Sequence, residues 1–254
     1  MLLSRRSFER HEPFKDSKCI YIFGEGVREF NYFKFFKEFD SRIKIEVYPL
    51  QSEGENNSPS GLYNIACNSL LKPQDNPIPV YDDFRDWMDE IWIVLDTDID
   101  RDSSRIPQIE QIRLACREEN QRLSLTNEFS DVWNIVESNP CFEVWLYYHV
   151  ENEKPDFDGI EISSTWKSFL DTALKGGFDL RKHPQLIGDA IKNAELNYQE
   201  IDFKPGVACT QVYRLAKSIY PLILEKLTAY PLILEKLTAY RLRNDNNFRT
   251  PDLA

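Results

Sequence analysis

The chain has 254 residues, of which 42% are hydrophobic and 29% charged, which suits one large globular domain or a domain with an appendage. Its formal net charge is −11, which disfavours unaided binding to nucleic acid, because that binding depends on Lys and Arg against phosphates. No apolar run approaches the roughly 18 residues of a membrane span, and the start lacks the apolar core of a secretory signal. We therefore expect a cytoplasmic protein without membrane contact, whose nucleic-acid contacts are local or supplied by a partner.

Cysteine and histidine usage argues against two common kinds of site. The five cysteines are odd in number and widely spaced, without a C-x-x-C pair, so neither a disulfide framework nor a thiolate zinc site is predicted. The three histidines form no H-x-x-x-H pair, which disfavours a hydrolytic zinc site.

The first predicted elements follow a polar N-terminal arm, residues 1–17. Residues 19–23 are a continuous apolar run that predicts a buried strand. The Gly-Glu-Gly sequence at 24–26 then suggests a tight turn that lets a ligand approach the backbone. Residues 28–39 carry aromatic side chains at helical spacing and predict a core-facing helix, and residues 43–50 alternate as a second strand.

The most informative stretch is IWIVLDTDID, residues 91–100. Its five apolar residues predict a strand buried on both faces, as in the centre of a parallel sheet. The carboxylates of Asp96, Asp98 and Asp100 follow at two-residue spacing, where α/β sheets place their ligand sites. A divalent cation would relieve their mutual repulsion, since Mg2+ prefers oxygen ligands. The alternative is that two of the three serve only as turn or helix-cap residues.

The next segments continue the alternation of helix and strand. Residues 104–122 predict a helix capped by one of two adjacent serines, and residues 132–136 predict a further strand. Asn139 and Pro140 are typical of the cap and the first residue of the next helix. His149 shares the apolar face of that helix, so we expect it to be a core or boundary residue.

Strands and helices alternate from residue 18 to 150, which predicts a domain built on a mostly parallel, Rossmann-like α/β sheet flanked by helices. No strand is predicted in residues 151–254, where periodic apolar positions indicate a helical C-terminal region, packed on the sheet or forming a small lobe. Within it, segment 221–230 is repeated identically at 231–240, which we interpret as a local duplication. Pro231 should kink or break a helix there.

Further carboxylates are expected at the same edge of the sheet. Glu25 follows the first strand, Glu29 lies one helical turn later, and Glu143 follows the last strand. Because parallel strands deliver their carboxyl ends to one edge, these acids should gather with Asp96 and Asp98. Such a cluster suits two-metal phosphoryl chemistry, in which one cation activates the attacking water and another steadies the leaving oxygen.

A Glu-Gly turn after the first strand and a D-x-D after a later one resemble the Toprim domain of topoisomerases, primases and OLD-type nucleases. The chain is more similar to the RloB-like family of bacterial defence-associated Toprim proteins. This closer likeness spans about residues 18 to 220 and is carried by segments 24–26, 29–33, 95–98, 138–149, 190–194 and 210–215. The string Ser-Asn-Pro-Cys-Phe-Glu-Val-Trp-Leu at 138–146 is its most specific motif.

The resemblance implies a Toprim-like fold and a nuclease site that depends on Mg2+ or Mn2+. The site residues that it implies are Glu25 as metal ligand or general base, Asp96 and Asp98 as metal ligands, Glu29 as second-metal ligand and Glu143 as a further catalytic acid. Asp100 stays open between metal ligand and turn residue. Arg28 stands before Glu29, where the family pattern has Thr. The resemblance also implies an ABC- or AAA-type ATPase partner in abortive infection against phage.

Two functions from different classes remain. The first is an endonuclease that cuts RNA, with tRNA as a candidate, or DNA, and that is restrained until infection. The second is a non-catalytic regulatory or interaction subunit of an ATPase-containing complex, which predicts binding without turnover. Retention of all the acids favours the nuclease, and a homo-oligomer is compatible with both. Nucleotidyl transfer of the primase kind uses the same carboxylates, but no second catalytic module or zinc-binding element accompanies them.

Overall fold

The computed structural model describes residues 18–47, 58–71, 81–97, 103–125, 131–155 and 177–247, without the side chains of residues 45–47 and 230–247. Its centre is a five-stranded sheet in the order β2-β1-β3-β4-β7. The strands are β1 (Ile20–Gly24), β2 (Ile43–Val47), β3 (Glu90–Asp96), β4 (Trp133–Asn139) and β7 (Cys209–Thr210). The first four pair in parallel, and β7 joins β4 antiparallel at the edge. The expected α/β fold with a mostly parallel sheet is confirmed.

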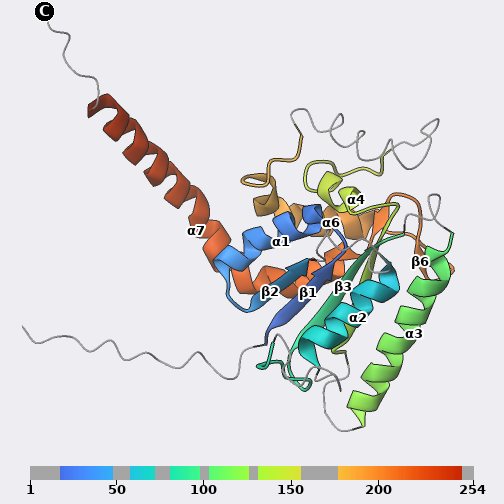
Figure 1. The fold of residues 1–254 in the computed structure, drawn as a ribbon. Coiled ribbons are helices and arrows are strands. Elements are labelled where there is room, and N and C mark those ends of the chain that lie inside the picture. The colour runs from blue at the N-terminus through green and yellow to red at the C-terminus, as the bar shows by residue number, and fades with distance from the viewer. Residues whose placement is uncertain are drawn as a thin grey trace, which may run out of the picture.

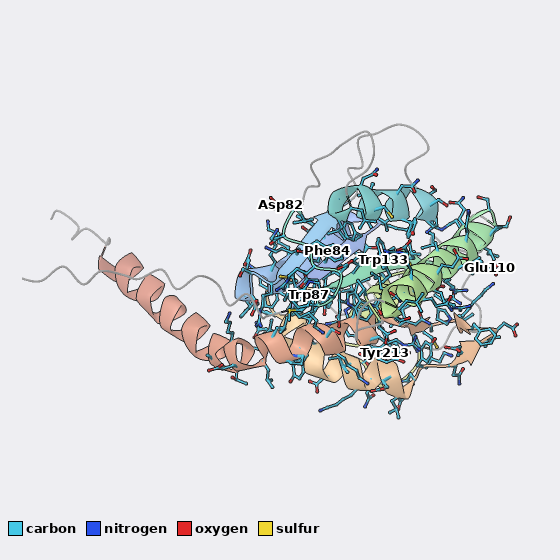
Figure 2. All side chains as sticks on the ribbon, turned by 90° about the horizontal axis from the view of Figure 1, so that it is seen from below. Asp82, Phe84, Trp87, Glu110, Trp133 and Tyr213 are labelled. Atoms are coloured by element: carbon cyan, nitrogen blue, oxygen red, sulfur yellow. The ribbon has the colours of Figure 1, made fainter. Side chains whose placement is uncertain are left out.

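Helices cover both faces of this sheet (Figure 1). One face carries α2 (Pro59–Leu70) and α3 (Arg105–Ser124). The other carries α1 (Val27–Phe39), α4 (Glu143–Tyr147), α6 (Ile187–Leu196) and α7 (Val212–Asn247). Figure 2 shows this layering from below, with α2 and α3 on one side of the strands and α6 and α7 on the other.

The central strands are apolar throughout because both of their faces are buried. In β1, Ile20 and Ile22 belong to the core beneath α1 and α7, whereas Tyr21 and Phe23 belong to the core beneath α2 and α3. Successive side chains on a strand point to opposite faces, so a strand between two helical layers needs apolar residues at every position. The continuous apolar runs in the sequence therefore mark the strands correctly.

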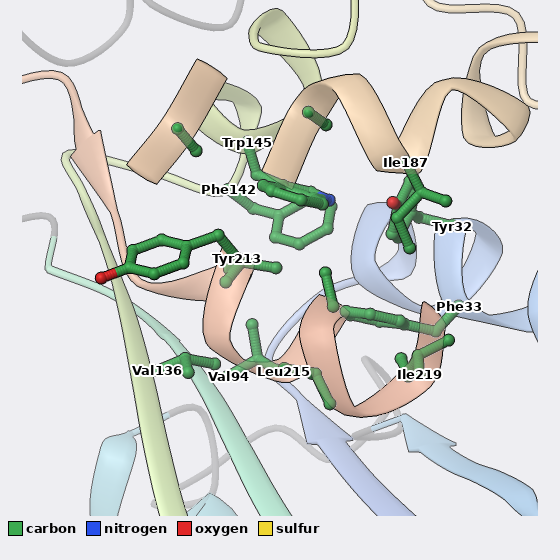
Figure 3. Packing of buried hydrophobic residues seen from close by; sticks show 14 of the residues in the cluster. Tyr32, Phe33, Val94, Val136, Phe142, Trp145, Ile187, Tyr213, Leu215 and Ile219 are labelled. Atoms are coloured by element: carbon green, nitrogen blue, oxygen red, sulfur yellow. The ribbon is translucent and has the colours of Figure 1, made fainter. Parts of the chain in front are cut away.

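The larger core lies between the sheet and the layer of α1, α4, α6 and α7. Figure 3 shows Phe33 of α1 beside Leu215 and Ile219 of α7, above Val94 and Val136 of the sheet. All five side chains are fully buried. The aromatic stripe on α1 is thus a core feature, as predicted.

The C-terminal region differs from the prediction in two ways. The expectation of no strand after residue 150 is wrong, because β5 (Glu200–Ile201) and β6 (Lys204–Pro205) form a hairpin and β7 extends the main sheet. These strands are only two residues long, too short to give a periodic signal. The periodic segments do form helices, and they pack on the sheet.

The tandem repeat lies in α7, which continues from Val212 to Asn247 without a break at Pro231. The expected break there is wrong. Buried side chains anchor the first half of α7 on the sheet, and Pro221 lies on its exposed side, where a proline ring disturbs packing least. A proline within a helix removes one backbone hydrogen bond, and α7 stays helical through both prolines.

The predicted cap at Asn139 is also wrong. Asn139 is the last residue of β4, its side-chain amide donates to the carbonyl oxygen of Pro205 at 2.8 Å, and the Asn139–Pro140 peptide is cis. The helix begins at Glu143, four residues after Asn139, with Phe142 in the cap position. The side chain of Asn139 thus makes a tertiary contact with β6 and does not cap a helix.

Candidate metal site

Two of the predicted acids lie at the ends of neighbouring strands. Asp96 is the last residue of β3, and Glu25 directly follows β1. Because β1 and β3 pair in parallel, both acids stand at the carboxyl edge of the sheet. Arg105, the first residue of α3, joins them: its Nη2 lies 2.6 Å from Oε1 of Glu25 and 2.8 Å from the backbone oxygen of Asp96.

The segment between β4 and α4 fixes the side chain of Asp96. Its side chain is buried, and its Oδ1 accepts a 2.8 Å hydrogen bond from the backbone N–H of Phe142. The backbone N–H of Thr97 donates to the carbonyl oxygen of Ser138 on β4. The carboxylate of Asp96 is therefore held in one orientation by the segment that leads into α4.

Glu143 joins the same edge from the first turn of α4. It is buried, and its Oε1 lies 2.9 Å from Nη1 of Arg28 on α1. Burial raises the pKa of the Cys141 thiol, and the nearby carboxylates of Asp96 and Glu143 raise it further. Glu143 is also the chain neighbour of Phe142, whose backbone N–H donates to Asp96, so both acids belong to this edge.

Glu29 lies under the turn between β1 and α1 and is 4% exposed. A Cβ atom at Gly26 would stand 2.6 Å from its Oε2, and one at Gly24 would stand 3.0 Å from its Cβ. A Cβ atom essentially never comes as close as 2.6 Å to another heavy atom, so a side chain at Gly26 would displace the carboxylate of Glu29. In the described residues, the two glycines make room for Glu29 itself, whereas the sequence suggested room for a ligand.

Asp98 and Asp100 lie outside the described residues, so the structure leaves their predicted roles open. Within the described part of the chain, no three His, Cys, Asp or Glu side chains lie close enough together to hold a metal ion. The acids at this edge offer carboxylate oxygens, the ligand type that a hard cation such as Mg2+ prefers. A metal site here needs Asp98 or a rearrangement of the Arg105–Glu25 pair to complete its ligand set.

The two arginines are the site residues that sequence reasoning missed. Arg28 was noted only as a departure from the family pattern, and Arg105 stood in an ordinary helical segment without any motif. Their positions follow from the fold, because α1 and α3 both begin at the carboxyl edge of the sheet. No local pattern in the sequence marks such a contact.

His149 belongs to the core and takes no part in this edge. It is 2% exposed; its Nδ1 lies 3.0 Å from the carbonyl oxygen of Trp145, and its Nε2 lies 2.9 Å from the hydroxyl of Tyr32. A carbonyl oxygen only accepts, so Nδ1 carries the proton and Nε2 accepts from Tyr32. The prediction of a core histidine is confirmed.

A family model described as RloB-like protein matches residues 20–219, a range that contains every acid and arginine discussed above. The chain belongs to the RloB-like family. The resemblance seen in the sequence is thereby confirmed for this family, and the wider relation to Toprim nucleases stays a prediction. Searches of curated proteins and of solved structures found no match. In the described residues of this RloB-like chain, no helix is long and apolar enough to cross a membrane.

Proposed function

We propose that this RloB-like protein is an Mg2+-dependent endonuclease that hydrolyses phosphodiester bonds in RNA or DNA. The observation that carries the proposal is that Glu25 and Asp96 follow and end two neighbouring parallel strands at one edge of the sheet, while Glu143 stands next to Phe142, whose backbone N–H holds Asp96. Open α/β sheets bind their ligands at this edge. Buried acids are costly to maintain, so the burial of Asp96 and Glu143 favours a functional explanation.

The carboxylates divide by accessibility into two roles. The Glu25 side chain is 20% exposed, so water and a cation can reach it. Asp96 is buried and oriented by Phe142, which suits a rigid metal ligand. We propose that Glu25, Asp96 and Asp98 hold the cation. A bound divalent cation supplies an activated water and stabilises developing charge on the phosphoryl oxygens.

The arginines and Glu143 support these ligands in the proposed mechanism. Arg105 holds Glu25 at the edge in the present structure and, once displaced by a cation, can offer its planar guanidinium to a substrate phosphate. Arg28 neutralises Glu143 and so stabilises that buried acid. These residues position and neutralise charge, and Glu25 accepts the proton from the attacking water.

The test is cleavage of tRNA, other RNA and plasmid DNA by the full chain in Mg2+, in Mn2+ and in EDTA. Glu25→Gln and Asp96→Asn remove one charge each with little change of shape. Loss of a residue that only supports a metal ligand costs up to about 100-fold in activity, so loss of a ligand itself should reduce the cleavage rate by at least about 100-fold. Glu119→Gln is the matched control: that acid pairs with Arg122 on exposed α3 surface, away from the edge, and its loss should leave the rate unchanged.

The competing function is a non-catalytic interaction subunit of an ATPase-containing defence complex. One observation favours it: Arg105 and Arg28 already neutralise Glu25 and Glu143, as in a purely structural ion-pair cluster. In that case the wild type cuts no substrate under any metal condition, and complex formation with an ABC- or AAA-type ATPase survives both Glu25→Gln and Asp96→Asn. A metal-dependent cut that both substitutions abolish contradicts it.

The biological setting follows from the family resemblance. We propose that the nuclease is a toxic effector in abortive infection, held inactive by its ATPase partner until phage infection. Expression of the wild type without that ATPase should then slow growth, and Asp96→Asn should relieve the toxicity. Equal toxicity of the two chains would contradict a role for nuclease activity.

A further inference from the structure

A small pocket is lined by Arg28 of α1, the same arginine that pairs with Glu143 of the candidate metal site. Its volume is about 180 Å³, and the described residues that line it are Arg28, Asn31, Leu146, Phe178 and Leu180. Three segments contribute: α1, α4 and the stretch that precedes the 3-10 helix η1 (His183–Leu186). The pocket is thus formed by the fold, and no single element supplies it.

Arg28 connects this pocket to the carboxylates. Its Nη1 lies 2.9 Å from Oε1 of Glu143, and it also lines the pocket together with Asn31, which lies three residues further along the same helix. Arg28 therefore belongs both to the pocket lining and to the ion pair with Glu143. Glu143 in turn follows Phe142, whose backbone N–H donates to Asp96, so the pocket is connected to the candidate site through these contacts.

The aromatic wall of the pocket is held in place by the core. The Phe178 ring is half-buried and makes a T-shaped contact with His149, with ring centroids 5.3 Å apart. It makes tilted contacts with His183 and Tyr32, with centroid distances of 5.0 and 6.3 Å. These contacts fix the ring, so a planar ligand that stacks on it loses little protein entropy. Leu146 is buried, while Leu180 is 37% exposed at the mouth.

The chemistry of the lining suits a single planar heterocycle. Phe178 offers an aromatic face, Leu146 and Leu180 offer apolar walls, and the Asn31 carboxamide both donates and accepts hydrogen bonds. Proteins read extruded bases with this combination: stacking between aromatic or apolar side chains and hydrogen bonds to the polar edge of the base. At about 180 Å³ the pocket is smaller than the roughly 300 Å³ and more of drug-sized ligand sites, so it admits one ring system only.

We propose that this pocket binds one nucleobase of the substrate strand, next to the phosphodiester bond that is cut, and so selects the cleavage position. The proposal rests on the nuclease function proposed above. The guanidinium of Arg28 then faces the phosphate that follows the bound base, a geometry that Arg favours. Asn31 is the residue that reads the base, and Phe178 is the residue that stacks on it.

The test separates base binding from cleavage. Adenosine, guanosine, cytidine and uridine 5′-monophosphates are titrated into the full chain in EDTA, with saturation-transfer NMR as the readout, so that no metal chemistry is needed. One base should bind at least about fivefold more tightly than the weakest, because only some bases match the hydrogen bonds of Asn31. Asn31→Ala should weaken that binding by about fivefold through loss of a hydrogen bond, and Phe178→Leu by about fivefold or more through loss of stacking.

Asn31→Ala is the decisive variant, because alanine favours the helix and Asn31 is only half-buried, so the fold should be unaffected. Gln121→Ala, an exposed amide on α3, is the matched control and should bind as the wild type does. No binding of any of the four nucleotides at millimolar concentration, or equal binding by the wild type and Asn31→Ala, would overturn the proposal.

Asp96→Asn distinguishes failure of this proposal from failure of the nuclease function. That variant should lose cleavage and keep nucleotide binding, because Asp96 does not line the pocket. Nucleotide binding by a wild type that cuts nothing refutes the nuclease and upholds the base pocket. Cleavage at positions that Asn31→Ala does not redistribute upholds the nuclease and refutes the pocket.

Discussion

The guanidinium of Arg105 caps the carboxylate of Glu25, with Nη2 2.6 Å from Oε1 and 2.7 Å from Oε2. The contact joins the first residue of α3 to the turn after β1, across a gap of 80 residues in sequence. Both side chains are largely shielded, at 12% and 20% exposure. A protein cation therefore stands where we propose that a metal ion binds.

Arg105→Gln should strengthen Mn2+ binding about tenfold, because hydrogen bonds to a charged group contribute about 1.5–3 kcal/mol and about 1.4 kcal/mol corresponds to tenfold in affinity. The measurement is a calorimetric titration of Mn2+ into the metal-free chain. Arg122→Gln, on an exposed pair with Glu119, should leave the affinity unchanged. If Glu25→Gln and Arg105→Gln both bind Mn2+ as the wild type does, Glu25 is not a ligand.

Stability should fall in acid because of His149. Burial lowers its pKa to about 3, well below the 6.5 of an unfolded chain. The unfolded state therefore takes up the proton first, so the stabilisation is complete above pH 6.5 and is lost as the pH falls toward 3, by up to about 1.4 kcal/mol per pH unit. Urea unfolding of the wild type at pH 7.5 and 5.0 measures the slope.

His149→Gln should lower stability at pH 7.5 and reduce that slope. Tyr32→Phe is the control, because it removes the hydrogen bond to Nε2 and leaves the buried imidazole in place. It should lower stability at both pH values by about 1 kcal/mol and keep most of the slope. An unchanged slope in His149→Gln would show that another group causes the acid sensitivity.

Arg113→Met should destabilise the protein by about 3–5 kcal/mol, since it leaves the carboxylate of Glu137 buried without its partner. Nε and Nη2 of Arg113 lie 2.6 and 2.5 Å from the two oxygens of Glu137, which is 2% exposed. Arg113→Met combined with Glu137→Met should recover most of the loss, because an apolar pair removes the buried charge. Urea unfolding of the single and double variants gives the coupling energy.

The pH dependence of the same variant checks the cause. Burial raises the pKa of Glu137, and Arg113 opposes this shift, so Arg113→Met should raise the pKa further. When the pKa of an acid is raised in the folded state, its ionised form destabilises the fold at a pH above that pKa. Protonation removes this destabilisation as the pH falls. The loss in Arg113→Met should therefore shrink between pH 7.5 and 5. The same loss at both pH values would contradict a buried charge as its source.

Phe203→Gly should stabilise the β5–β6 hairpin by about 1 kcal/mol. Asp202 and Phe203 have φ angles of 50° and 62°, and the left-handed region costs an L-residue about 1–2 kcal/mol more than glycine. Phe203 is 84% exposed, so its ring contributes little packing. Phe203→Ala keeps the strain and should bring no gain. Thermal unfolding separates the two, and equal melting temperatures would show that the turn is not strained.

Much of the architecture follows from local patterns. The apolar runs before Gly24 and Asp96 mark β1 and β3 because a strand covered by helices on both faces has no polar side. The spacing of aromatic residues likewise marks α1 as a core helix. Parallel pairing then places Glu25 and Asp96 at one edge, so that part of the candidate site could be predicted from sequence.

Only the tertiary structure shows how those acids are held. Arg105, Arg28 and the backbone N–H of Phe142 reach Glu25, Glu143 and Asp96 across 46 to 115 positions of sequence, and no periodicity encodes such contacts. The same holds for Asn139, which cap statistics assign to a helix and which the fold uses against Pro205. Sequence determined which segments are buried, since burial acts on each residue's own chemistry. Tertiary structure decided which charges meet, because long-range pairing depends on how the whole chain packs.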